Sequence, residues 1–266
     1  IIIAVGNIGA ISATVPLAIS VSAFGWRGTF VLLALVTAII AALCLALIRD
    51  RPADQTSQEN KMGMVAGLKM VFAGGRKFWP MAVAYFLIYG SIMVFQGTWS
   101  KVYFDSVYGF TVLSVWLVAM IGIGKIFSTV LVGVMAGRKI IGSKRIMMIL
   151  GNVGFAAVWL AVWLFAGKMD SPLFWGVVCT LFGFFGGFMT LSFSQVKEWF
   201  PLSIAGTSVA AMNVFLFLGA SVCTAVAGAI IGTSYTVENF SLVWGLMFAG
   251  SLAAVAAAYV SKENRE

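Results

Sequence analysis

Eight long apolar runs limit what this chain can fold into. Each run reaches the length of about 20 residues that an α-helix needs to cross the hydrocarbon core of a bilayer. An outer-membrane β-barrel would instead show segments of about 10 residues with alternating polarity. The sequence therefore predicts an all-α, polytopic membrane helix bundle with eight transmembrane helices. The runs are Ile1–Ser22, Gly28–Ile48, Trp79–Ser100, Val112–Ala136, Ile146–Gly167, Pro172–Ser194, Leu202–Gly232 and Phe240–Ser261.

The composition agrees with a membrane protein and argues against an enzyme. Hydrophobic residues make up 61% of the chain and charged residues 10%, whereas soluble domains carry about 25% charged residues. The cysteines Cys44, Cys179 and Cys223 lie inside apolar runs without metal-binding or redox spacing, and histidine is absent. No Asp or Glu lies in the middle of a run, and no Walker motif occurs. We therefore expect no cofactor, no metal and no catalytic residues.

The net charge of +8 follows from the topology rather than from nucleic-acid binding. When the runs are threaded through a membrane, thirteen of the 17 Lys and Arg residues fall on one side and three on the other, with Lys125 inside a run. This asymmetry is the positive-inside pattern. It predicts that the basic loops and the C-terminus are cytoplasmic, in the inner membrane of a bacterium. The basic side holds Arg49, Arg51, Lys61, Lys69, Arg76, Lys77, Arg138, Lys139, Lys144, Arg145, Lys197, Lys262 and Arg265.

Two short motifs and their spacing resemble the major facilitator superfamily. Gly25-Trp-Arg-Gly-Thr-Phe30 stands before the second run, and Lys197-Glu-Trp-Phe-Pro201 stands before the seventh. Two runs, a long basic loop and six further runs match the fifth to twelfth helices of that family. The resemblance implies twelve helices in two halves of six. Because the chain starts at Ile1 inside an apolar run, we expect it to be a fragment that lacks the first four helices.

The same layout predicts three parts. Residues 1–48 would be the last two helices of the N-terminal half, residues 49–78 a cytoplasmic central linker, and residues 79–266 the six-helix C-terminal half. Within the linker, Met62–Ala73 fits either an amphipathic helix at the membrane surface or a disordered segment.

The resemblance also predicts a cytoplasmic loop motif, formed here by Gly133, Arg138 and Lys139. In family members an acidic residue precedes the basic positions, whereas Gly137 occupies that place in this chain. The gating role of the family's loop is therefore in doubt for this half. The helix motif of the family's drug antiporters is also poorly matched around Pro16, which disfavours drug efflux.

Lys125 is the strongest candidate for a binding residue, because it lies in the middle of Val112–Ala136. A lysine at this depth costs roughly 2.5–3.5 kcal/mol on insertion scales. Its helical neighbours Gly122, Ser128 and Thr129 are small or polar, which indicates a face turned toward other helices. The ammonium group would bind a carboxylate or phosphate of a substrate, or pair with an acid outside this chain. The alternative is a structural cation bonded to backbone carbonyls.

Further polar candidates lie on three other runs. Tyr85, Tyr89 and Gln96 are spaced by four and seven residues, which places them on one helix face. Asn213 and Asn152 are single amides on separate runs. All five suit a substrate cavity, but such residues also form hydrogen bonds between helices in membranes.

Other residues are expected to serve packing and anchoring. Gly183 and Gly187 form a small-x-x-x-small pair that predicts a close helix–helix contact. Several tryptophans near run ends are expected to anchor the protein at the membrane interfaces. These are Trp26, Trp79, Trp99, Trp175 and Trp199.

The function that these features favour is secondary active transport of a small solute by alternating access. Lys125 favours an anionic metabolite, and coupling to protons is left open. The alternative is a non-transporting membrane sensor or assembly protein on the same scaffold. The expected partners are the solute, the lipid bilayer and, where coupling exists, protons. We expect no nucleic-acid partner and a monomeric full-length protein.

Overall fold

Seven helical segments in the described part of the chain are long and apolar enough to cross a membrane. The computed structural model describes residues 15–47, 63–138 and 143–261, with the single positions Gly6, Gly9, Ser12 and Ala13. All regular secondary structure within these residues is helical. The predicted all-α membrane bundle is therefore confirmed. The segments are Val15–Leu47, Gly75–Tyr108, Leu113–Gly137, Lys144–Leu164, Pro172–Trp199, Leu202–Ile231 and Val237–Val260.

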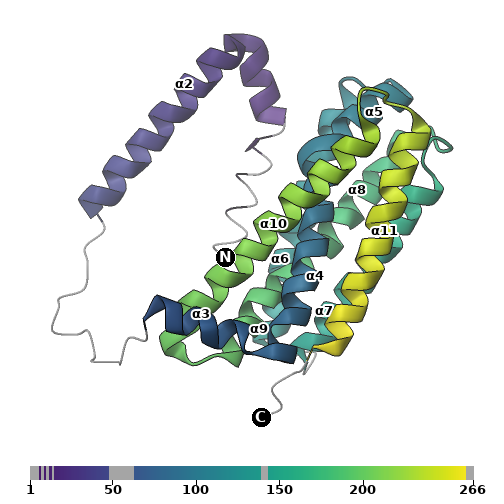
Figure 1. Cartoon of the computed structure of the whole chain (residues 1–266). Coiled ribbons are helices and arrows are strands. Elements are labelled where there is room, and N and C mark those ends of the chain that lie inside the picture. Colours follow the sequence, from purple (N-terminus) through teal and green to yellow (C-terminus); the bar gives the residue numbers. More distant parts are fainter. Residues whose placement is uncertain are drawn as a thin grey trace.

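The first segment, α2 (Val15–Leu47), bends back on itself at Gly25 (Figure 1). Gly25 has φ 68° and ψ 168°, a combination that is essentially restricted to glycine. The hydroxyls of Ser20 and Thr29 lie 3.2 Å apart across the bend. The two predicted runs before and after this point are thus two helices joined directly, without an intervening loop. The run Ile1–Ser22 is described only in part.

A short helix, α3 (Met64–Phe72), precedes the bundle and lies beside the segment Leu202–Ile231 (Figure 1). A Cβ atom on Gly67 would lie 3.3 Å from Ile204 Cγ2, and Val71 is fully buried. Of the two structures expected for Met62–Ala73, the helix is present. Its placement at the membrane surface stays a prediction, and residues 48–62 lie outside the described part of the chain.

Six segments pack into one bundle (Figure 1). The segment that starts the bundle consists of η2 (Gly75–Lys77), α4 (Trp79–Ile92), the π-helix η3 (Met93–Trp99) and α5 (Ser100–Tyr108). The next two are α6 (Leu113–Gly137) and α7 (Lys144–Leu164). The following one combines α8 (Pro172–Gly187), η4 (Phe188–Thr190) and α9 (Leu191–Trp199). After η5 (Leu202–Ile204), α10 (Ala205–Ile231) and α11 (Val237–Val260) complete it.

Local sequence signals explain where several helices begin and end. The Ser143 hydroxyl accepts a hydrogen bond from the Ile146 amide at 3.1 Å and caps α7. Thr236 caps α11 in the same way, with 3.3 Å between its hydroxyl and the Asn239 nitrogen. Helix α8 follows Ser171 and starts with Pro172, whose missing N–H costs nothing at that position. Gly109 ends α5 in the left-handed conformation, with φ 70°.

Glycines allow α6 and α8 to touch backbone to backbone. A Cβ atom on Gly183 would lie 1.8 Å from the Ile121 carbonyl oxygen, and one on Gly124 would lie 2.0 Å from the Thr180 carbonyl oxygen. One on Gly187 would lie 2.6 Å from Ser128 Oγ. The close contact predicted from the Gly183–Gly187 pair is confirmed. Such approaches gain dispersion energy, which in lipid replaces the hydrophobic effect between helices.

Aromatic rings fill the centre of the bundle. The Phe95 ring lies 4.9 Å from that of Phe182 and 5.6 Å from that of Trp159, between centroids. All three side chains are fully buried. Trp175 and Trp199, which were expected at the membrane interface, are also buried at 0% and 7% exposure. That expectation is wrong for these two residues, because their helices turn them inward.

Candidate functional site

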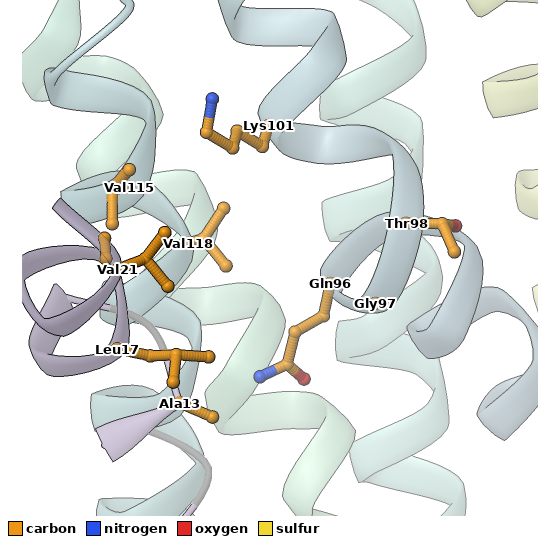
Figure 2. A pocket seen from close by; sticks show the side chains of 10 residues that line it. Ala13, Leu17, Val21, Gln96, Gly97, Thr98, Lys101, Val115 and Val118 are labelled. Atoms are coloured by element: carbon orange, nitrogen blue, oxygen red, sulfur yellow. The ribbon is translucent and has the colours of Figure 1, made fainter. Parts of the chain in front are cut away.

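A cavity of 520 Å³ lies where α2 approaches the bundle. Its wall comes from α2 and from two consecutive parts of the bundle, the η3–α5 junction and α6 (Figure 2). The lining is mostly apolar, and its polar side chains belong to Gln96, Thr98 and Lys101. The remaining lining residues are Ala13, Leu17, Ala18, Val21, Gly97, Val115 and Val118.

The π-helix η3 determines how Gln96 enters this cavity. Its wide turn closes i→i+5 bonds instead of i→i+4 bonds, and Thr98 Oγ1 donates to the Met93 carbonyl at 3.1 Å and to that of Val94 at 2.9 Å. The Gln96 amide points into the cavity and away from Lys101 (Figure 2). It forms no hydrogen bond with any residue that the structure describes. The amide is therefore available to a solute.

Lys101 stands at one end of the cavity and was not selected from the sequence. Its ammonium group forms an ion pair with Asp105, one helical turn further along α5. The i,i+4 spacing of a lysine and an aspartate is a signal for such a pair. Because the Asp105 carboxylate offsets its charge, Lys101 should attract an anionic solute less strongly than an unpaired lysine would.

Lys125 continues the face of α6 that lines the cavity. It follows Val118 by seven residues, which is about 10 Å along the axis and nearly the same direction around the helix. The side chain is partly buried and forms no ion pair or hydrogen bond with a described residue. The adjacent Gly124 touches the backbone of α8. The structure thus places a cation with no partner among the described residues two turns beyond the cavity wall, outside the residues that line the cavity itself.

The two tyrosines lie apart from Gln96. Tyr85 and Tyr89 stack with their ring centroids 6.5 Å apart, and Tyr85 meets Phe193 of α9 edge to face at 5.0 Å. Neither residue lines the cavity. The spacing of four and seven assumed a regular α-helix up to Gln96, but the π-helix from Met93 changes the direction of every later side chain. Their hydroxyl groups form no hydrogen bond with described residues.

The two asparagines are not brought to the cavity either. Asn152 is buried in α7, next to Gly151, whose added Cβ would lie 2.3 Å from Phe188 Cβ. Asn213 is partly buried in α10. A role for either residue in binding stays a prediction.

The predicted loop motif lies at the end of α6. Gly133 and Arg138 are both exposed there, while Lys139 lies outside the described residues. Close by in sequence, the Lys144 ammonium donates to Ser194 Oγ at 3.0 Å and forms an ion pair with Glu198 at the end of α9. Sequence reasoning missed this pair because its members are 54 residues apart.

Comparison with known proteins identifies the family of this helix bundle. The sequence model of the Major Facilitator Superfamily matches residues 1–142 of the 266-residue chain. A search of curated proteins found no match. The matched region includes α2, the cavity wall and α6 with Lys125. The chain is therefore an integral membrane protein of a secondary-transporter family, and it belongs to the Major Facilitator Superfamily.

Proposed function

We propose that this transporter moves a small anionic metabolite by alternating access, and that Lys125 binds the anionic group of the solute. The observation that carries this proposal is an ammonium group in the middle of a membrane span without an ion-pair partner among the described residues. An unpaired charge at that depth is costly, and such residues mark substrate and ion pathways. A carboxylate or phosphate would offset the cost with charge-assisted hydrogen bonds.

The cavity supports a route to that cation. Gln96 offers an unpartnered amide in the cavity wall, and the wall formed by Val115 and Val118 continues along α6 to Lys125. An apolar wall with a few polar groups is the usual composition of a small-molecule site. We therefore assign Gln96 to orienting the solute and Lys125 to charge recognition. Tyr85, Tyr89, Asn152 and Asn213 remain second-rank candidates.

The proposal includes proton coupling, with Lys125 as the carrier. No Asp or Glu lies in the middle of an apolar run anywhere in the sequence. A carboxylate carrier would therefore have to come from outside this chain. Lys101 at the cavity is paired with Asp105, whereas the Lys125 ammonium has no ion-pair partner among the described residues, and release of its proton would abolish its attraction for an anion.

The topology proposal follows from charge. The ends of α6 and α9 and the starts of α4 and α7 carry the basic residues, and from the positive-inside rule we infer that these ends and the C-terminus are cytoplasmic. Residues 1–48 would then belong to one half of the transporter and residues 79–266 to the other, with 49–78 as a cytoplasmic linker. Support comes from the packing of α4 to α11 into one bundle while α2 stands beside it (Figure 1). A bacterial inner-membrane location and a monomeric state complete the proposal.

Uptake by the full-length protein in proteoliposomes tests the role of Lys125. A panel of labelled carboxylates, organic phosphates and neutral solutes identifies the substrate class, with and without a pH gradient. We expect Lys125→Met to lower uptake of the anionic substrate about tenfold or more, because a charge-assisted hydrogen bond contributes about 1.5–3 kcal/mol. Lys125→Arg should retain part of the activity.

Lys168→Met is the matched control, because Lys168 is an exposed lysine outside the spans. It should transport like the unmodified protein. Unchanged uptake in Lys125→Met, or a substrate that proves to be neutral, would remove the basis for the proposed charge recognition. If uptake does not change with the pH gradient, the proposed proton coupling is wrong, while the proposed charge recognition by Lys125 is unaffected.

A further inference from the structure

A second groove lies on the outside of the bundle, away from the proposed solute path. It has a volume of 400 Å³ and runs between the start of α4 and the end of α11. Figure 1 shows α4 between α10 and α11, and the groove lies in the seam between α4 and α11. Ala256 and Ala257 line it with small side chains, and Val83 and Val260, which also line it, are about half exposed.

A cationic group stands at the mouth of this groove. Arg76 is exposed and forms no ion pair with a described residue, and Lys77 follows it directly. Gly75, with φ 51°, makes the turn that places both residues just before α4. The positive end of the α4 dipole lies at the same place and adds to the attraction for an anion.

The neighbourhood does not neutralise this charge. Arg145 of α7 lies with its guanidinium carbon 5.5 Å from the Tyr259 ring, and Tyr259 is next to the groove residue Val260. Among the described residues, Glu198 is the acid at this end of the bundle, and it is already paired with Lys144. Asp105 near the end of α5, Asp170 in the connection before α8 and Glu238 at the start of α11 lie at the opposite end of the bundle. Among the residues that the structure describes, positive charge therefore predominates around the groove.

Trp79 gives the groove a rigid edge at the boundary of the apolar span. Its indole N–H donates to the Phe72 carbonyl at 3.1 Å, and its ring stacks on Phe72 at a centroid distance of 5.8 Å. The ring is 43% exposed on its remaining side. A fixed tryptophan beside an arginine at the start of a span marks the level where lipid headgroups meet acyl chains.

The apolar surface continues deeper along the same seam. A second crevice of 220 Å³ begins one turn beyond Val83, at Leu87, and is completed by Leu246 and Gly250 of α11 and by residues of α10. From Pro80 to Ser91 at its far end, α4 rises about 16 Å. An acyl chain could follow this path, whereas a free phosphate would use only the cationic mouth.

We infer that the seam between α4 and α11 binds an anionic glycerophospholipid, with its phosphate at Arg76 and Lys77 and an acyl chain along the seam. Basic pockets between transmembrane helices are known to bind anionic lipid headgroups. The combination of a guanidinium without an ion-pair partner among the described residues, a fixed indole and two apolar crevices that follow one another along α4 matches both parts of such a lipid. This lipid site is independent of the solute and of Lys125.

Native mass spectrometry of the full-length, delipidated protein tests the site. Phosphatidylglycerol and phosphatidylcholine with the same acyl chains are titrated in separate experiments. We expect tighter binding of phosphatidylglycerol, and a loss of about tenfold in its affinity in Arg76→Gln, since a hydrogen bond to a charged group is removed. Arg138→Gln is the matched control, because Arg138 is an exposed arginine at the same end of the bundle but outside the groove.

A second variant separates the lipid from a free phosphate. Ala256→Leu fills the groove at an exposed position, so the fold should tolerate it while lipid binding falls. Equal affinity for the two lipids, or unchanged binding in Arg76→Gln, would overturn the inference. So would displacement of the lipid by millimolar glycerol 3-phosphate together with normal binding in Ala256→Leu. Monodisperse elution of each variant in detergent shows that it is folded.

Discussion

Helix α2 and the α4–α11 bundle are both apolar, yet they use their apolar residues differently. Along α2 the mean hydropathy reaches 3.0, against 1.7–2.3 for the other six spans. Its large side chains, such as Phe30 and Ile39, are more than 60% exposed, whereas Phe95 and Trp159 of the bundle are fully buried. Between lipid-embedded helices apolarity itself supplies little attraction. Close backbone contacts and interlocking rings therefore hold the bundle together, whereas the ring pair in the described part of α2, Trp26 with Phe30, lies within α2 itself.

Replacing a glycine at a helix–helix contact should destabilise the bundle more than any of the other changes below. Gly183→Leu would force α8 away from the Ile121 carbonyl, because the added Cβ has no room. We expect a loss above about 4 kcal/mol, in the range reserved for severe clashes, and failure to elute as a monodisperse species in detergent. Ala34→Leu on exposed α2 is the control and should elute normally. Equal behaviour of the two variants would mean that the α6–α8 contact does not support the bundle.

Removing a core ring should have the next largest effect. Phe182 lies 4.9 Å from Phe95 and from Phe155, measured between ring centroids. Phe182→Ala should destabilise the bundle by about 3–5 kcal/mol through lost contacts and a cavity, seen as a lower melting temperature in detergent. Phe30→Ala on α2, where the ring is 66% exposed, should change the melting temperature little. A similar fall in both would contradict the distinction between the two regions.

Breaking the ion pair at the end of the bundle should have the smallest effect. Lys144 and Glu198 join α7 to α9, and their side chains are 28% and 54% exposed. Exposed pairs contribute about 0–1 kcal/mol, so Glu198→Gln should lower the melting temperature only slightly. The difference from the unmodified protein should shrink in high salt. A double-mutant cycle with Lys144→Met measures the interaction free energy of the pair. A value of several kcal/mol would contradict this prediction and show that the pair is a main contribution to the packing of α7 against α9.

The spans were predictable because apolar runs and helix caps are local signals. The run Val112–Ala136 corresponds to α6 within one residue at each end. The run Pro172–Ser194 begins where α8 begins, but the helical segment extends to Trp199. The sequence predicted a short connection between the first two helices. In the structure, the single residue Gly25 makes this connection.

The arrangement of side chains around the cavity was less predictable. Periodicity placed Tyr85, Tyr89 and Gln96 on one face, but no simple residue pattern announces the π-helix from Met93 that redirects Gln96. Burial of Trp175 depends on which way its helix faces, which position within a run does not reveal. Lys125 was found from depth alone, whereas its relation to the cavity wall required the register of α6 against α2 and η3.

The reciprocal glycine contacts of α6 and α8 also have a mechanical consequence. The Thr180 carbonyl packs against Gly124 and the Ile121 carbonyl packs against Gly183. Each helix therefore has a gap at a glycine that a carbonyl oxygen of the other helix fills. Neither helix can roll about its axis or slide along its partner without driving an oxygen atom into a backbone. Lys125 is the residue next to one of these gaps, so its direction is set by main-chain atoms and not by adjustable side chains. The two helices should therefore travel as one rigid body, and the ammonium group with them.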